Sequence, residues 1–188
     1  MPPRTATDTY LAKRGERLDI SFDVDLGELI RGHHVIARGI MHGRQIRTRR
    51  IDPDLIRELM SRGDPDNGGG FIQWPAGSGP GDEEVTSTEA ELHYEFVPAL
   101  GADAQGFGWY WMLSVSDDVG TEYNENNGGA FDADATGVAA HGSRDLGGQI
   151  SPAATRLTIR FTPPDDWEPP EPWRREIVVD LREGRLVR

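Results

Sequence analysis

The sequence predicts a mainly β protein, folded as an antiparallel two-layer β-sandwich with one short helix. Three observations predict this class. Four segments alternate apolar and polar residues with a period of two, which is the pattern of strands buried on one face. Clusters of Gly, Asp, Asn and Pro separate these segments, as turns do. A single segment has helical spacing, which disfavours alternating β-α units.

Four strands are predicted most firmly. In residues 18–26, the even positions from Leu18 to Leu26 are apolar and share one face, whereas the odd positions are polar. The same alternation marks residues 89–97, 156–162 and 175–182. Weaker strands are predicted from shorter alternation or aromatic and β-branched residues at 34–41, 44–51, 71–74 and 109–116.

One helix is predicted at residues 53–62. Asp52 suits the N-cap, Pro53 suits the first helical position, and Gly63 ends the segment. Its apolar side chains form one stripe, made of Leu55, Ile56, Leu59 and Met60. We expect this helix to lie over an open end or face of the sandwich.

The 188 residues are expected to form a single β-sandwich domain, 1–188, in which residues 1–15 are a flexible N-terminal segment. Surface loops are predicted at residues 64–70, 74–84, 99–108 and 123–148, where turn-forming residues gather. The chain contains no cysteine. Disulfides, a thiol nucleophile and thiolate metal sites are therefore excluded.

The C-terminal half resembles a known class of domains. The motifs that carry this resemblance are LHYEF at 92–96, WYWMLSVSDDVGTEY at 109–123, and the last two predicted strands. Their order is similar to that of immunoglobulin-like β-sandwiches in uncharacterised bacterial proteins. The resemblance implies an immunoglobulin-like fold, with no reaction attached. The chain departs from such domains in lacking a cysteine pair and in adding a helix.

Charge is distributed unevenly along the chain. Residues 1–63 carry +3, residues 64–143 carry 15 acidic and no basic side chains, and residues 144–188 sum to zero, which gives the total of −12. Nucleic acid is disfavoured as a partner, because phosphate binding needs clustered cations. No signal-peptide or membrane-span pattern is found, so a soluble, cytoplasmic protein with no membrane partner is expected.

The acidic loops hold the candidate metal site. Asp132, Asp134 and Thr136 alternate before Gly137, like the start of a calcium-binding loop, but the twelfth position falls on Ser143 and no helices are predicted beside it. The candidate Ca²⁺ ligands are Asp117, Asp118, Glu122, Asp132 and Asp134. The alternative interpretation is that both segments are solvated turns. No other cofactor is expected.

A histidine lies between two carboxylates on one predicted strand. Glu91, His93 and Glu95 share the face opposite Leu92 and Tyr94. Two carboxylates would raise the pKa of an imidazole, as in a catalytic base or a metal ligand. The alternative is a solvated, salt-bridged outer face, paired with the polar side of residues 156–160.

Three classes of function follow. The leading hypothesis is a non-catalytic binding or assembly module, whose acidic, loop-rich face meets a protein partner or a second copy of the chain. The second is a metal-assisted hydrolase that uses Asp117, Asp118, Asp132, Asp134 or His93. The third is a carbohydrate-binding module, which requires exposed rings at Trp109, Trp111, Trp167 or Trp173. No catalytic residue is assigned.

Overall fold

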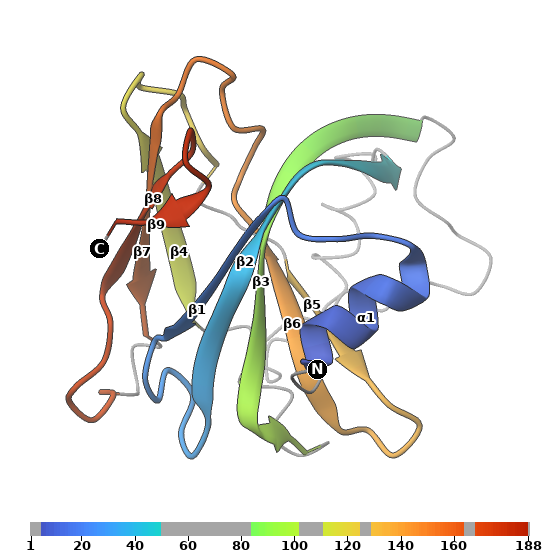
Figure 1. The fold of residues 1–188 in the computed structure, drawn as a ribbon. Helices are drawn as coiled ribbons and strands as arrows, with labels where there is room; N and C mark the ends of the chain where they lie inside the picture. The colour runs from blue at the N-terminus through green and yellow to red at the C-terminus, as the bar shows by residue number, and fades with distance from the viewer. Residues whose placement is uncertain (1–4, 50–83, 102–110, 125–128, 164–167, 188) are drawn as a thin grey trace, which may run out of the picture. The chain divides into compact units, whose positions relative to one another are not determined.

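The computed structural model describes residues 5–49, 84–101, 111–124, 129–163 and 168–187 (Figure 1). The chain divides into two compact units, one made of residues 1–44 with 88–188 and the other of residues 45–87, where the sequence predicts one domain. The predicted helix at 53–62 and the predicted strand at 71–74 lie outside the described residues. Both sheets and the helix described below belong to the first unit, except for residues 45–49 and 84–87. These residues are the ends of the two longest strands and belong to the second unit.

The protein is mainly β, as predicted, and its strands form two antiparallel sheets. A five-stranded sheet has the order β1-β2-β3-β6-β5, and a four-stranded sheet has the order β4-β7-β8-β9. The first sheet contains β1 (Ile20–Asp25), β2 (His34–Arg49), β3 (Glu84–Leu100), β5 (Gly129–Ala133) and β6 (Ala139–Asp145). The second contains β4 (Met112–Asp117), β7 (Arg156–Thr162), β8 (Glu176–Asp180) and β9 (Arg185–Leu186).

One hydrophobic core joins the two sheets, which makes the unit a two-layer sandwich. Leu92 and Tyr94 enter it from β3, and Leu157 and Ile159 enter it from β7, all fully buried. Trp111, at the entrance to β4, is also fully buried and packs edge-on against Tyr94 with ring centroids 5.0 Å apart. Burying aliphatic and aromatic side chains of this size stabilises a fold by about 1.5–3 kcal/mol each.

The core also contains a cation. Arg144 on β6 is 2% exposed, donates a 2.8 Å hydrogen bond to the Trp111 carbonyl, and holds its guanidinium carbon 5.3 Å from the centre of the Trp111 ring. Burial lowers the pKa of Arg144, because a low-dielectric environment disfavours the charged form. The same burial raises the pKa of Tyr94.

The alternating segments become strands in the predicted places. Residues 156–162 are β7, residues 176–180 are β8, and 20–25 are β1, where Ile20 and Val24 face the core. Leu18 differs from the prediction. It precedes β1 and packs against a second apolar cluster, formed by Tyr10, Leu11 and Met41.

Two strands arise where the sequence predicts a loop. Residues 123–148 contain β5 and β6, which pair antiparallel from Gly129 opposite Arg144 to Ala133 opposite Ala139. The alternation is hidden in β6 because its core-facing positions are Gly142 and Arg144. A Cβ on Gly142 would lie 2.7 Å from atoms of the Tyr94 ring, so Tyr94 fills the space of the missing side chain.

Within the segment predicted to be flexible, residues 1–15, the structure has helix α1 (Ala6–Arg14). Thr5 is the N-cap and forms a reciprocal capping box with Asp8, and Gly15 ends the helix with φ 69°. Figure 1 shows α1 beside β6, to which it packs. Buried Tyr10 and Leu11 attach the helix to the sheet.

Candidate functional site

The polar side chains of β3 and β6 are buried, although they lie on the side of the sheet opposite the sandwich core. We call this group the covered polar face, and it consists of Glu91, His93, Glu95, His141 and Ser143, each no more than 6% exposed. The two strands pair with His93 opposite Ser143 and Glu95 opposite His141. The predicted pairing of this face with residues 156–160 is therefore wrong, since those residues form β7 in the other sheet.

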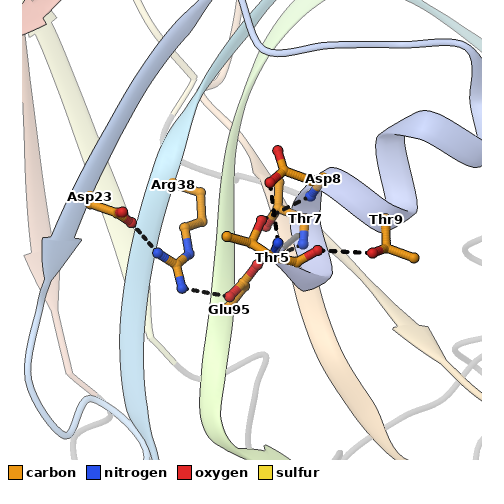
Figure 2. Close-up of polar contacts among 7 residues, drawn as sticks. All are labelled: Thr5, Thr7, Asp8, Thr9, Asp23, Arg38 and Glu95. Carbon is orange, nitrogen blue, oxygen red and sulfur yellow. Dashed lines mark hydrogen bonds and ion pairs between the residues drawn. The ribbon is translucent and has the colours of Figure 1, made fainter. Parts of the chain in front are cut away.

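Glu95 anchors the N-terminus of α1 to this face (Figure 2). Its carboxylate accepts a 2.6 Å hydrogen bond from the backbone N–H of Thr7, in the first turn of the helix. Its other oxygen accepts a 2.7 Å bond from Arg38 on β2, which also pairs with the exposed Asp23 on β1. The carboxylate therefore meets both the positive end of a helix dipole and a guanidinium, which stabilise its charge.

His93 and His141 form a hydrogen-bonded pair in the middle of the covered polar face. His93 Nδ1 lies 3.1 Å from His141 Nε2, and the rings are 5.3 Å apart with an interplanar angle of 23°. His93 Nε2 lies 3.4 Å from a Glu91 carboxylate oxygen. His141 Nδ1 is buried without a hydrogen-bond partner.

These contacts assign the protons of the pair. A proton on His93 Nε2 faces the Glu91 carboxylate, so His93 Nδ1 is left as an acceptor for a proton on His141 Nε2. The alternative arrangement would point a bare nitrogen at the carboxylate. His141 Nδ1 is therefore unprotonated, and burial, aided by His93, lowers the pKa of His141 to about 3, although Glu91 opposes the shift.

Helix α1 covers the pair through Tyr10. The Tyr10 ring stacks on His141 with centroids 4.1 Å apart, and its centroid lies 6.4 Å from that of His93. The Arg14 guanidinium lies 4.5 Å from the centre of the Tyr10 ring. His93, one of the five residues that the hydrolase hypothesis offers, has no exposed surface.

Asp117 and Asp118 organise a turn at the end of β4. The Asp117 carboxylate accepts hydrogen bonds from the N–H groups of Val119 and Thr121 and from the Tyr123 hydroxyl. Asp118 accepts bonds from the Thr155 hydroxyl and N–H. The Thr155 hydroxyl contributes most to lowering the pKa of Asp118, to about 2.

Asp134 organises the turn between β5 and β6 in the same way. Its carboxylate accepts bonds from the Thr136 hydroxyl and N–H and from the Val138 N–H, and the Thr136 hydroxyl contributes most to lowering its pKa. Asp132 lies on β5 and Glu122 in the turn after β4, both exposed. In the described ranges, which include all five predicted ligands, no three His, Asp or Glu side chains are grouped to hold a metal ion. The calcium site stays a prediction.

A groove lies on the four-stranded sheet beside the proline-rich segment. Its volume is about 700 Å³, within the range of ligand sites. Its walls include Ser114 on β4, Arg160 and Thr162 on β7, and Glu171, Trp173 and Arg175 from the segment before β8. Charges of both signs meet there, with Arg175 3.1 Å from Glu171 and its guanidinium 4.8 Å from the centre of the Trp173 ring.

The tryptophans divide between core and groove. Trp111 is fully buried in the core, and half-buried Trp173 packs against the core while lining the groove. Trp109 and Trp167 lie outside the described residues.

Comparison of the chain with protein-family models, curated proteins and solved structures finds no match. Among the residues that the structure describes, no helix has the length and apolar character needed to cross a bilayer. The groove and the covered polar face are the two features of the described residues that bear on function.

Proposed function

We propose that this protein is a non-catalytic binding module that holds a protein partner in the groove between β7 and the proline-rich segment. The observation that carries the proposal is the composition of the groove. It joins an aromatic ring, two arginines and two glutamates over one concave surface. Tryptophan and arginine are the residues most enriched among the hot spots of protein interfaces, and charges of both signs at a rim select the partner.

The environment of Trp173 favours a protein over a sugar as the partner. A sugar stacks on an open aromatic face, but the Arg175 guanidinium lies over the Trp173 ring. The residue is also packed closely against the chain, because a Cβ on Gly27 would lie 2.7 Å from the Trp173 Cβ. A guanidinium on a ring is itself a surface that carboxylate and aromatic side chains of a partner can contact.

The acidic segment, residues 64–143, indicates that the partner carries a basic surface. Asp118 and Asp134 are exposed, and hydrogen bonds hold both carboxylates in place, from Thr155 for Asp118 and from its own turn for Asp134. Fixed carboxylates attract a basic protein surface at lower entropic cost than mobile ones. An immunoglobulin-like type of sandwich would suit a scaffold of this kind.

The test begins with capture of partners on the immobilised protein. Each captured protein is purified, and its affinity is measured by calorimetry against the wild type and two variants. The double variant Arg160→Glu/Arg175→Glu reverses both groove arginines, whereas Arg182→Glu reverses an exposed arginine in the β8–β9 turn, outside the groove. We expect the double variant to bind at least about 30-fold more weakly, as hot-spot losses do, and the control to bind like the wild type.

Self-association is measured with the same variants by light scattering at low and high salt. A second copy as the partner predicts a dimer that the double variant and high salt both weaken. A partner that binds both variants equally well would place the interface elsewhere and refute the proposal. A monomer at both salt concentrations that also captures no protein would refute it too.

A further inference from the structure

We propose that helix α1 is a proton-released cover: acidification protonates His141, and the charged histidine pair displaces α1 from the covered polar face. The structure provides a buried base, a lid that seals it, and a lid attachment that is small.

The buried base is Nδ1 of His141. The Glu91 carboxylate lies 3.4 Å from His93 Nε2, and His93 Nδ1 is hydrogen-bonded to His141 Nε2, so His141 Nδ1 is left bare, buried and without a hydrogen-bond partner. A proton added there would have no acceptor and would place a charge in a site closed to water. The cost of an unpaired buried charge is high, so the docked state excludes the proton.

The surroundings of the pair give incomplete compensation for that charge. The titratable and charged groups that face it are Glu91 and Glu95 on β3, Asp145 on β6, Arg38 on β2, and Tyr10 and Arg14 on α1. Glu91 contacts His93 and not the bare nitrogen. Glu95 is committed to Arg38 and to the Thr7 N–H. Arg14 adds a second positive charge on the Tyr10 ring that stacks on His141.

The attachment of α1 is limited to a few side chains. The helix has nine residues, of which Thr7, Tyr10 and Leu11 are buried. Tyr10 and Leu11 share a small cluster with Met41 and Leu18, separate from the main core. A short helix held by so few buried residues can leave without opening the sandwich, since local opening costs less than global unfolding.

The direction of the pH dependence follows from linkage. The pKa of His141 in the docked state is lowered to about 3, whereas a solvated imidazole has a pKa of about 6.5. The released state therefore binds the proton first. The docking free energy from His141 is complete above pH 6.5 and is lost progressively as the pH falls from 6.5 toward 3. Between pH 7.5 and 5.0 this coupling multiplies the ratio of released to docked helix by about 30.

Amide hydrogen exchange of the full chain tests the proposal. Protection factors, corrected for intrinsic exchange at each pH, are measured for α1 and for β7 as an internal reference. We expect the α1 protection to fall about 30-fold between pH 7.5 and 5.0, while the β7 protection changes much less. The fall should begin near pH 6.5.

Three variants identify the group responsible. His141→Gln keeps a polar side chain that does not titrate in this range, so α1 should stay protected at pH 5.0. His141→Phe, which keeps a ring for Tyr10 to stack on, serves if the glutamine variant does not fold. His42→Gln removes an exposed histidine of β2 and should retain the 30-fold fall.

Four results would overturn the proposal. In the first, α1 protection in the wild type is the same at pH 7.5 and 5.0. In the second, both His141 variants lose protection as the wild type does. In the third, the fall begins only below pH 4.5, outside the range in which a solvated imidazole titrates. Equal losses in α1 and β7 would show global acid unfolding and would also count against it.

Discussion

The backbone N–H of Thr7 donates a 2.6 Å hydrogen bond to the buried carboxylate of Glu95, 88 residues further along the chain. This contact joins the first turn of α1 to the middle of the five-stranded sheet. The same carboxylate, whose side chain is 8% exposed, also pairs with Arg38 on β2, 2.7 Å away. Three properties of the fold depend on this arrangement, namely the position of α1, the burial of the histidine pair and the polarity of the covered face.

Glu95→Gln should lower the free energy of unfolding by about 2–4 kcal/mol, because it leaves Arg38 and the helix N-terminus without a buried anion. Urea unfolding measures the change. Asp23→Asn is the matched control, since Asp23 pairs with the same guanidinium but its side chain is 73% exposed. The control should cost less than about 1 kcal/mol. Equal losses in the two variants would mean that the buried contact adds nothing.

Gly142→Ala should destabilise the sandwich by about 1–3 kcal/mol, as overpacking of a filled core does. The new methyl group would lie 2.7 Å from two ring atoms and the hydroxyl oxygen of Tyr94. Gly101→Ala is the control, because a Cβ there has no atom within 4 Å. Thermal unfolding of both variants checks the prediction, and an unchanged melting temperature for Gly142→Ala would show that the β6 backbone can move away from Tyr94.

Thr155→Val should raise the pKa of Asp118 from about 2 toward its usual range, because the Thr155 hydroxyl is the largest cause of the shift. A carboxyl with a lowered pKa stabilises the fold above its unfolded pKa and loses that effect as the pH falls through about 2. In the variant the folded and unfolded pKa values lie closer together, so less of this stabilisation is present to be lost on acidification. Carbon-13 titration of the carboxyl groups measures this directly. Thr136→Val is the control, since it should shift Asp134 and leave Asp118 unchanged.

Calcium added to chelator-treated protein should leave the melting temperature unchanged. The carboxylates of Asp117 and Asp134 already accept hydrogen bonds from their own turns, and that of Asp118 accepts them from Thr155. A calcium site needs six to eight oxygen ligands around one ion. Calorimetric titration with differential scanning is the measurement. A rise in melting temperature together with binding heat would instead support the calcium site predicted from the sequence, and Asp134→Asn would then be expected to abolish it.

The strands that the sequence predicts are those whose side chains alternate without interruption. β7 matches the predicted residues 156–162, because Leu157, Ile159 and Phe161 enter the core and polar residues separate them. β6 escapes prediction because its core side is Gly142 and Arg144, which have no hydrophobic signal. Its packing depends on Tyr94, a residue 48 positions earlier, and such long-range complementarity has no local pattern.

The sequence predicts which residues share the covered polar face but not that this face is buried. The period of two places Glu91, His93 and Glu95 on one face, and the structure confirms that they share the side opposite Leu92. Their burial could not be read from β3, since it depends on α1 and on His141. The helix did leave a signal: Thr5 and Asp8 have the spacing of a capping box, and Gly15 follows the last basic residue. Because only three residues of the helix are buried, its apolar stripe is too weak to predict the helix.

The central relationship is that α1 seals a neutral histidine pair on the five-stranded sheet. The protonation state of His141 tests it most directly. Long-range proton–nitrogen spectra report the state of each ring nitrogen. At pH 5.5, in molecules whose α1 amides remain protected, we predict a neutral His141 with its proton on Nε2, whereas the urea-unfolded chain should be about 90% protonated there. A protonated His141 beneath a docked α1 at that pH would contradict the account.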